Sequence, residues 1–547
     1  MKEVSSFSNI AGPKLNLSKS EGLLLGPLKN TNVKVLCGVK FSEKPIKYLG
    51  IYVGHNKEDC SVLNWDRKIG KMEEIINIWG KRNLTVFGKA MVVNVLVVPK
   101  VICNCMLFPV PEPIIAKIEK MVSKFLWHGR DRISRNCIIN DIENGGINIV
   151  DVKTKINSLK AGWVKRWLNH PPWTVVAQSY IEKLGFNFDL LFSMNVKHIS
   201  DLPVLKQLPV FYQDVWLAFY SSKFCKTLTK MSDYDFLSSQ IWGNDLFKFQ
   251  NRCIFFKSWV SSNIVYVKDV FDASGKFISE VDLISRIKDT RNWMTEYATV
   301  KKVILSKSNI FKTEKSRYIN MPSSTKLLFC NGKRLVDLIT ENNSMFYEIL
   351  VNKKSTRHYM ERVWENKFNK SYSTTQWKSI YNRKIKLVPC VKLKEFNYKL
   401  IHNLIYSGYI LNKWKPSISR NCSFCNQIET TEHLLLSCSR VQNIWKTIGE
   451  CINIDIKLHH LVIGLDESYA EITNKTKNLV IMITAYSIFV GWVKCGDTKD
   501  RYKYLNLWNN VKIYLNYYEK IFENFLLHVK WFPKYVKVVE YLNSINV

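Results

Sequence analysis

Three cysteines and one histidine lie close together near the C-terminal end of the sequence, and they constrain its fold more than any other feature. Cys422, Cys425, His433 and Cys438 are spaced C-x2-C-x7-H-x4-C and fall within 17 residues. Two thiolates on a tight turn can hold a metal ion from one side while an imidazole and a third thiolate complete a tetrahedron. The spacing therefore predicts a structural Zn²⁺ site whose four protein ligands leave no open position for catalysis.

The chain should break between the last two of these residues. Five residues along an α-helix rotate by about 500°, so His433 and Cys438 would not share a face of one continuous helix. Ser439 and Gln442 are spaced as a capping box, and an apolar stripe follows: Val441, Ile444, Trp445 and Ile448. The alternative is that the cysteines are buried small residues and the histidine is a hydrogen-bonded core residue. The polar spacers favour zinc, which would contribute on the order of 10 kcal/mol to folding of this segment.

The net charge indicates a polyanionic partner, with nucleic acid as the first candidate. The 547 residues carry 80 Lys and Arg against 46 Asp and Glu, a formal charge of +34. Residues 301–420 alone hold 25 basic and 7 acidic residues, interleaved with aromatic side chains. A charged run of this kind can be a solvated linker. Its aromatic rings can stack on bases or form a core, and the sequence does not separate these two roles. No motif indicates a small-molecule substrate.

The sequence indicates neither secretion nor a membrane span. Residues 1–20 lack the basic tip and apolar block of a signal peptide. The longest apolar run, 479–493, is 15 residues long, whereas a bilayer span requires roughly 20, so a buried helix is expected. The 14 cysteines lack the framework of a small secreted protein. We therefore expect reduced thiols and a location in the nucleus or the cytoplasm.

Apolar spacing predicts a mainly α-helical protein with a small antiparallel β-sheet at its N-terminus. Three short apolar runs between residues 15 and 53, separated by Gly-Pro and Pro-containing breaks, predict the sheet. From Trp65 to Trp79 the spacing becomes helical, and a second apolar helix is expected over 87–98. Long helices are expected from about residue 455 onward.

The best-defined helix is expected to begin at Pro113. Its apolar stripe consists of Ile114, Ile118, Met121, Val122 and Phe125. Lys117, Lys120 and Lys124 fall along the flanking face, and the next loop adds Arg130, Arg132 and Arg135. Such a line of cations can follow a phosphate backbone, although an ordinary solvated face explains the helix alone equally well.

Several short motifs occur in a fixed order along the chain. Residues 7–21 read F-x4-G-x-KLN-x2-KSE, and Lys47-Tyr48-Leu49-Gly50 follows. Downstream come Gly88-Lys89, Pro99-Lys100, Phe125-Leu126-Trp127 with Gly129, Gly145-Gly146, and Ser158-Leu159-Lys160 before Trp163. In this order the motifs resemble the palm, the primer-gripping hairpin and the thumb of the reverse transcriptases of LINE-type (non-LTR) retrotransposons. The Cys-His cluster, with His402 upstream and Trp445 downstream, resembles the zinc-binding domain of the same family.

The resemblance implies a domain order and a parent activity. The order is a partial palm (1–60), a helical thumb-like domain (61–175), a basic helical connecting region (176–374), the zinc-binding domain (375–455) and a C-terminal helical region (456–547). The parent activity is RNA-directed DNA polymerisation. Because the sequence has no adjacent Asp-Asp pair to hold two metal ions, the catalytic aspartates are expected upstream of Met1, and no catalytic residue is assigned.

The resulting expectation is a truncated retrotransposon reverse transcriptase that is inactive alone and binds RNA or RNA–DNA hybrid of its own element. Its expected contacts are Lys47 and Tyr48, the three lysines from Lys117 to Lys124, and the three arginines that follow. The alternative is a non-functional remnant, or a domesticated protein-interaction scaffold whose charge is only inherited. Exposed apolar surface is also expected on residues 1–60, where the rest of a palm sheet would pair.

Overall fold

The computed structural model of the chain describes most of its length. The described residues are 2–24, 26–31, 33–129, 131–168, 171–172, 174–223, 231–272, 274–287, 291–308, 328–330, 335–337, 342–386, 390–466, 471–494, 506–526 and 532–545. They form two compact units. Unit 1 comprises Met1–Ile75, Val98–Lys120 and Asp151–Lys354, and unit 2 comprises Ile76–Val97, Met121–Val150 and Ser355–Val547. Helices predominate and the strands are short, which confirms the expected mainly α-helical class.

The N-terminal part of unit 1 carries the small sheet after a helix, α1 (Lys2–Ala11). Strands β1 (Glu21–Gly22), β2 (Val35–Leu36) and β3 (Val39–Phe41) pair in the order β1-β3-β2. β2 is antiparallel to β3, whereas β1 is parallel to it, so this sheet is mixed. The first apolar run forms little strand, because the Asn16 side chain accepts the backbone N–H of Lys19 and caps a 3₁₀ turn at Leu17–Lys19.

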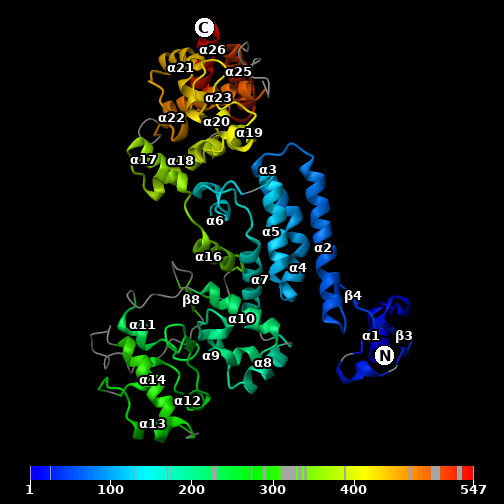
Figure 1. The fold of residues 1–547 in the computed structure, drawn as a ribbon. Coiled ribbons are helices and arrows are strands. Elements are labelled where there is room, and N and C mark those ends of the chain that lie inside the picture. The colour runs from blue at the N-terminus through cyan, green and yellow to red at the C-terminus, as the bar shows by residue number, and fades with distance from the viewer. Residues whose placement is uncertain are drawn as a thin grey trace. The chain divides into compact units, whose positions relative to one another are not determined.

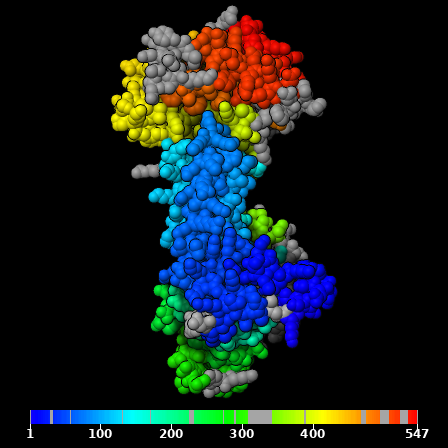
Figure 2. Space-filling view, turned by 90° about the vertical axis from the view of Figure 1, so that its right-hand side faces the viewer, coloured from blue at the N-terminus to red at the C-terminus, as the bar shows by residue number. Residues whose placement is uncertain are grey.

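A separate antiparallel hairpin follows the mixed sheet. It pairs β4 (Ile46–Tyr48) with β5 (Ile51–Val53), and its turn places Leu49 and Gly50 at positive φ. The whole N-terminal segment exposes apolar side chains: Phe7, Ile10, Leu28, Val35, Leu36, Tyr48 and Leu49 are all more than half exposed. Figure 2 shows this segment in dark blue at the surface. This agrees with the exposed apolar side chains expected on residues 1–60.

The helices predicted between residues 57 and 127 are present. α2 (Lys57–Gly80) starts before Trp65, because the Asn56 side chain accepts the backbone N–H of Glu58 at its N-terminus. α3 (Val86–Val92) continues as a π turn (Val93–Val97), and Pro99 opens α4 (Pro99–Leu107). In α5 (Glu112–Trp127) the buried stripe includes Ile115 in place of Ile114.

The remainder of unit 1 packs around three helices: α7 (Val152–Trp167), α10 (Val210–Ser222) and α16 (Ser344–Lys354), which lie together in Figure 1. Aromatic rings fill the space between them, with the ring centroids of Trp167 and Trp216 5.8 Å apart. The other elements of this unit are α8 (Thr174–Lys183), α9 (Phe188–Ser193), α11 (Asp233–Leu237), β6 (Lys248–Phe249), β7 (Arg252–Cys253), α12 (Lys257–Ser261), α13 (Glu280–Arg286), α14 (Trp293–Ser308), β8 (Leu328–Cys330) and β9 (Leu335–Asp337).

A buried carboxylate begins α7. The Asp151 side chain accepts hydrogen bonds from the backbone N–H and the hydroxyl of Thr154, at 3.0 and 2.6 Å, and Lys354 Nζ of α16 lies 2.9 Å from both carboxylate oxygens. Burial alone would raise the pKa of Asp151, but these donors outweigh it and the pKa is lowered. Asp151 therefore caps α7 as an anion and joins α7 to α16.

One core extends through most of unit 2. Besides α3, the helices of unit 2 are α6 (Arg135–Ile138), α17 (Tyr359–Phe368), α18 (Thr374–Lys386), α19 (Val391–Ile401), α20 (Gly408–Trp414), α21 (Ser439–Ile452), α22 (Leu458–Val462), α23 (Glu471–Lys494), α25 (Leu507–Leu526) and α26 (Phe532–Ser544). Figure 1 shows the last six of these gathered together. A continuous cluster of buried apolar residues begins at Met360, includes Cys422 and Cys438, and ends at Leu542.

The helix expected over 479–493 lies in this core. Within the part of the chain that the structure describes, Asn474–Val493 is long and apolar enough to cross a membrane, and the consecutive pair Val86–Val97 and Pro99–Leu107 also meets that criterion when taken together. Of the Asn474–Val493 window, 67% is buried inside the protein. Leu479, Ile481 and Ile483 are fully buried, as in an ordinary core helix.

A glycine pair in unit 2 supplies a prediction on stability. A Cβ at Gly146 would lie 2.0 Å from the carbonyl oxygen of Asn140, and backbone cannot yield as a side chain can. We expect Gly146→Ala to lower the free energy of unfolding of unit 2 by about 1–3 kcal/mol. Gly129→Ala is the matched control, because a Cβ there meets nothing within 4 Å. Thermal denaturation of both variants tests this, and equal melting temperatures would contradict it.

Candidate metal centre

The first two cysteines of the predicted site lie on a tight turn. The N–H of Cys422 donates to the carbonyl of Gln427 (2.8 Å), and the N–H of Asn426 donates back to the carbonyl of Cys422 (2.9 Å). Asn426 takes a φ of 57°, which closes the turn in the left-handed region that Asn tolerates. Outside it, a backbone bridge pairs Asn421 with Ile428. The turn directs both thiols to the same side, where they meet the other two ligand candidates.

The histidine and the third cysteine are placed by a π turn, His433–Ser437. The N–H of Cys438 donates to the carbonyl of His433 at 3.0 Å, an i→i+5 bond that brings residues five apart into register. The predicted break is present, since Cys438 is extended (φ −64°, ψ 132°) and α21 starts at Ser439. The predicted capping box is wrong: Cys438 is the N-cap residue, and Gln442 Nε2 donates to the carbonyl of Ser437 at 3.3 Å.

The four ligand atoms form a compact group. The sulfur of Cys438 lies 3.9 Å from each of the other two sulfurs, and Cys425 Sγ lies 3.2 Å from His433 Nε2. All four atoms lie within 4.8 Å of one another. A tetrahedral zinc ion with bonds of about 2.3 Å to sulfur and 2.0 Å to nitrogen requires sulfur–sulfur separations of about 3.8 Å and sulfur–nitrogen separations of about 3.5 Å. The donor set and its dimensions therefore fit Zn²⁺.

The surroundings favour a thiolate at Cys422, whereas the hydrogen bond with Cys422 and burial raise the pKa of the Cys438 thiol. Cys422, His433 and Cys438 are buried, and Cys425 is half-buried. Hydrogen bonding to Cys438 and to backbone N–H groups lowers the pKa of Cys422, although burial opposes this. A thiolate is the form that binds metal. The neighbouring packing is apolar, with Leu434, Leu435 and Val441 buried, and Trp445 Nε1 donates to the carbonyl of Leu435 at 2.6 Å. Such a site can cross-link the chain but leaves no coordination position for a substrate.

The residues predicted to contact nucleic acid lie on β4, on α5 and in the segment that follows α5. Lys120 and Lys124 of α5 are exposed, and Lys117 forms an exposed ion pair with Glu73 at 3.4 Å. Lys47 and Tyr48 are exposed on β4. The three arginines after α5 differ: Arg130 lies outside the described residues, Arg135 is half-buried, and Arg132 stacks on Tyr406 and Trp414. The nucleic-acid contacts remain a prediction.

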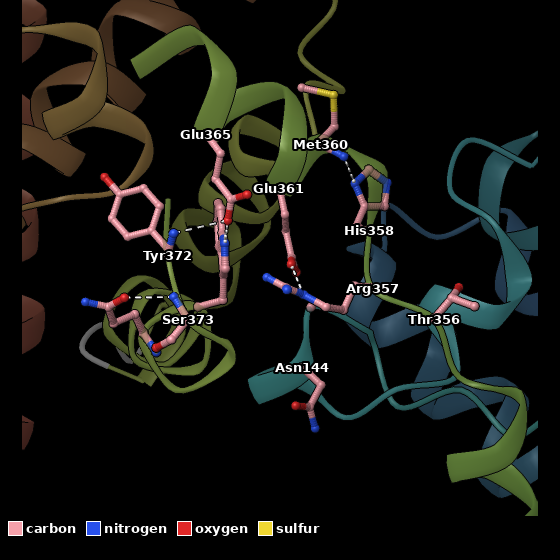
Figure 3. Close-up of polar contacts among 12 residues, drawn as sticks. Asn144, Thr356, Arg357, His358, Met360, Glu361, Glu365, Tyr372 and Ser373 are labelled. Carbon is pink, nitrogen blue, oxygen red and sulfur yellow. Dashed lines mark hydrogen bonds and ion pairs between the residues drawn. The ribbon is translucent and has the colours of Figure 1, made fainter. Parts of the chain in front are cut away.

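A polar network around the buried side chain of Glu361 was not predicted. Figure 3 shows it: Glu361 lies against Arg357, and Glu365 accepts the backbone N–H of Tyr372 at 3.3 Å. Glu361 also accepts the hydroxyl of Tyr381 at 3.0 Å. Burial raises the pKa of Glu361, and Arg357 opposes the rise. The i, i+4 spacing of the two glutamates, one helical turn apart, was the available signal in the sequence.

Two buried histidines lie near this network. Burial lowers the pKa of His358 to about 4, and His358 Nδ1 accepts the backbone N–H of Met360 at 3.1 Å. The ring of His402 lies 4.3 Å from that of His358, centroid to centroid, and burial lowers the pKa of His402 well below its usual value. Burial thus favours the neutral form of both rings, and neither histidine belongs to the group of metal-ligand candidates found among the described residues.

Comparison with known proteins supports a zinc-binding role for the segment that contains these four residues. Residues 343–445 match a family described as zinc-binding in reverse transcriptase, and the match contains all four clustered residues. The chain is also 22% identical over 488 residues to a Xenopus laevis protein described as the transposon TX1 uncharacterized 149 kDa protein. That alignment covers 80% of this chain and 36% of the relative, so the chain spans about a third of the length of the relative that it matches. The chain is thus related to the reverse transcriptases of non-LTR retrotransposons and carries a zinc-binding segment of the kind found in reverse transcriptases.

Proposed function

We propose that this chain is the nucleic-acid-gripping part of a retrotransposon reverse transcriptase and that it binds RNA or an RNA–DNA hybrid. The observation that carries the proposal is the charge of +34, displayed in part as the exposed lysines along α5. A surface of this sign attracts any polyanion, and the relation to reverse transcriptases makes nucleic acid the natural one. The proposal concerns binding and assigns no catalytic residue, although the parent activity is RNA-directed DNA polymerisation.

In this proposal Cys422, Cys425, His433 and Cys438 hold a structural zinc ion. The separations and the burial of the four donors support the assignment. The ion would cross-link the Cys422 turn to the start of α21, which fixes the segment that precedes α21. Its role is to hold the chain in shape, so nucleic-acid affinity depends on it only through the fold.

The salt dependence of binding tests the proposed function. Each phosphate that a cation neutralises releases counterions, so affinity for a 20-base-pair RNA–DNA hybrid should fall by at least about 10³-fold between 50 and 200 mM salt. Filter binding over a salt series gives the slope of log affinity against log salt. Absence of retention at low salt would reject the proposal and favour the alternative, a protein-interaction scaffold.

A triple substitution locates the contacts. Changing Lys117, Lys120 and Lys124 to glutamine should reduce the magnitude of that slope by about 2–3, because each lost phosphate contact removes about 0.9. The control changes three exposed lysines elsewhere, Lys206, Lys257 and Lys276, and alters the net charge equally. If both triple variants lower the slope to the same extent, the charge acts globally and α5 is not a specific contact.

A further inference from the structure

Trp414, which precedes the cysteine turn in the sequence, has its ring oriented by two neighbouring side chains and is nevertheless exposed. Trp414 ends α20 and is 52% exposed. The guanidinium carbon of Arg132 lies 4.0 Å from the centroid of its ring, and the ring of Tyr406 meets it nearly edge-on, at 5.1 Å and 77°. Arg132 and Tyr406 thus orient the indole, while about half of its surface stays open to solvent.

This arrangement removes the usual cost of using an exposed aromatic ring for binding. A free tryptophan loses rotamer entropy when a ligand immobilises it, at about 0.5–1.5 kcal/mol per side chain. Arg132 and Tyr406 have already restricted the ring of Trp414, so little of that cost remains. The cation also rests on the electron-rich face of the indole, which stabilises the ring in this orientation.

The residues that flank Trp414 in the sequence are basic and favour an anionic ligand. Lys413 and Lys415 flank it and are exposed, and Arg420 is exposed further along. The sequence from residue 400 to residue 428 contains no Asp or Glu. A second exposed ring, Tyr409, has the ammonium group of Lys413 4.4 Å from its centroid. Flat apolar rings beside cations match a ligand that alternates flat bases with phosphates.

We infer that Trp414 is a stacking site for an unpaired base, and that Lys413 and Lys415 bind the adjoining phosphates of a single strand. The inference rests on the proposed function, which it narrows to a strand with accessible bases at this surface. Bases inside a duplex are stacked on each other and cannot place a face on an indole, so this site distinguishes a single strand from a hybrid.

The test separates stacking from charge by comparing two strands with the same phosphates. One is a 20-mer of thymidine and the other a 20-mer of abasic sites. The intact 547-residue chain should bind the thymidine strand about tenfold more tightly, because stacking of one base on an aromatic side chain strengthens binding by roughly that factor. Trp414→Ala should abolish the preference and leave affinity for the abasic strand within about twofold. Trp414→Phe should retain most of the preference, and Tyr541→Ala, at another exposed ring, should retain all of it.

A crosslink in the unaltered protein makes the result independent of folding in the variants. A strand with 5-iodouracil, irradiated in the complex, should attach to the peptide that contains Trp414. Equal affinity of the unaltered protein for the two strands, equal loss of both in Trp414→Ala, or no crosslink at this peptide would overturn the inference while the proposed function stands. Absence of binding to the strands and to the hybrid alike would overturn both.

Discussion

Replacing Cys438 by serine is expected to unfold the zinc-binding segment rather than to loosen it. Cys438 joins the π turn of His433 to α21, and its sulfur lies 3.9 Å from both other sulfurs. Structural zinc contributes on the order of 10 kcal/mol to folding of its segment, and a serine hydroxyl is a poor substitute for a thiolate. The purified variant should lose its stoichiometric zinc, measured by elemental mass spectrometry, and its melting temperature should fall steeply.

A cysteine on the same helix serves as the matched control. Cys451 is half-buried in α21 and lies outside the cluster, so Cys451→Ser should keep the metal and lower the melting temperature only slightly. A chelator added to the unaltered protein should reproduce the effect of Cys438→Ser. Full zinc content together with unchanged melting in Cys438→Ser would show that Cys438 is a buried core residue and not a ligand.

Substitution of Asp151 by alanine is expected to destabilise unit 1 by about 3 kcal/mol, because it removes the N-cap of α7 and leaves Lys354 without its carboxylate partner. The folded-state pKa of Asp151 is lowered, so its contribution is present above the ordinary Asp value of about 3.9 and is lost as the pH falls below it. The difference between the two proteins should therefore be full at pH 7 and shrink below about pH 4. Urea denaturation, with hydrogen exchange of α7 read by mass spectrometry, measures it.

An exposed cap provides the comparison for Asp151. Asp141 accepts the backbone N–H of Asn144 at 3.0 Å and has an exposed side chain, so Asp141→Ala should cost about 1 kcal/mol or less. Equal effects of the two substitutions at pH 7 would mean that the ion pair with Lys354 adds nothing beyond the cap.

The sequence predicted the elements whose signal is local. The C-x2-C-x7-H-x4-C spacing identified four residues that the structure brings together, and the helical period identified α2 and α5. The π turn at His433 could not be predicted from a period of 3.6 residues, because it depends on the i→i+5 bond to Cys438. The parallel pairing of β1 with β3 was missed for a similar reason, since a two-residue strand carries no alternation to read.

Contacts between residues far apart in the sequence were not predicted. The phosphate contact predicted for Arg132 stays a prediction, but the sequence did not reveal that Arg132 lies over Tyr406 and Trp414, about 280 residues further along the chain. Glu361 has its Tyr381 partner on another helix, and the two buried histidines depend on packing from several elements. Pairings between distant residues leave no periodic mark in one sequence.

The residues that match the zinc-binding family and the residues that form one buried core do not have the same C-terminal border. The family match ends at Trp445, in the middle of α21, whereas the buried cluster that holds Cys422 and Cys438 continues to Leu542 of α26. Both α23 and α26 contact α21. A recombinant fragment cut at the border of the match would lose α23 and α26 and expose apolar side chains that they cover, so it should aggregate even with its metal bound. Fragments for crystallisation or for transfer into another protein should therefore extend through α26.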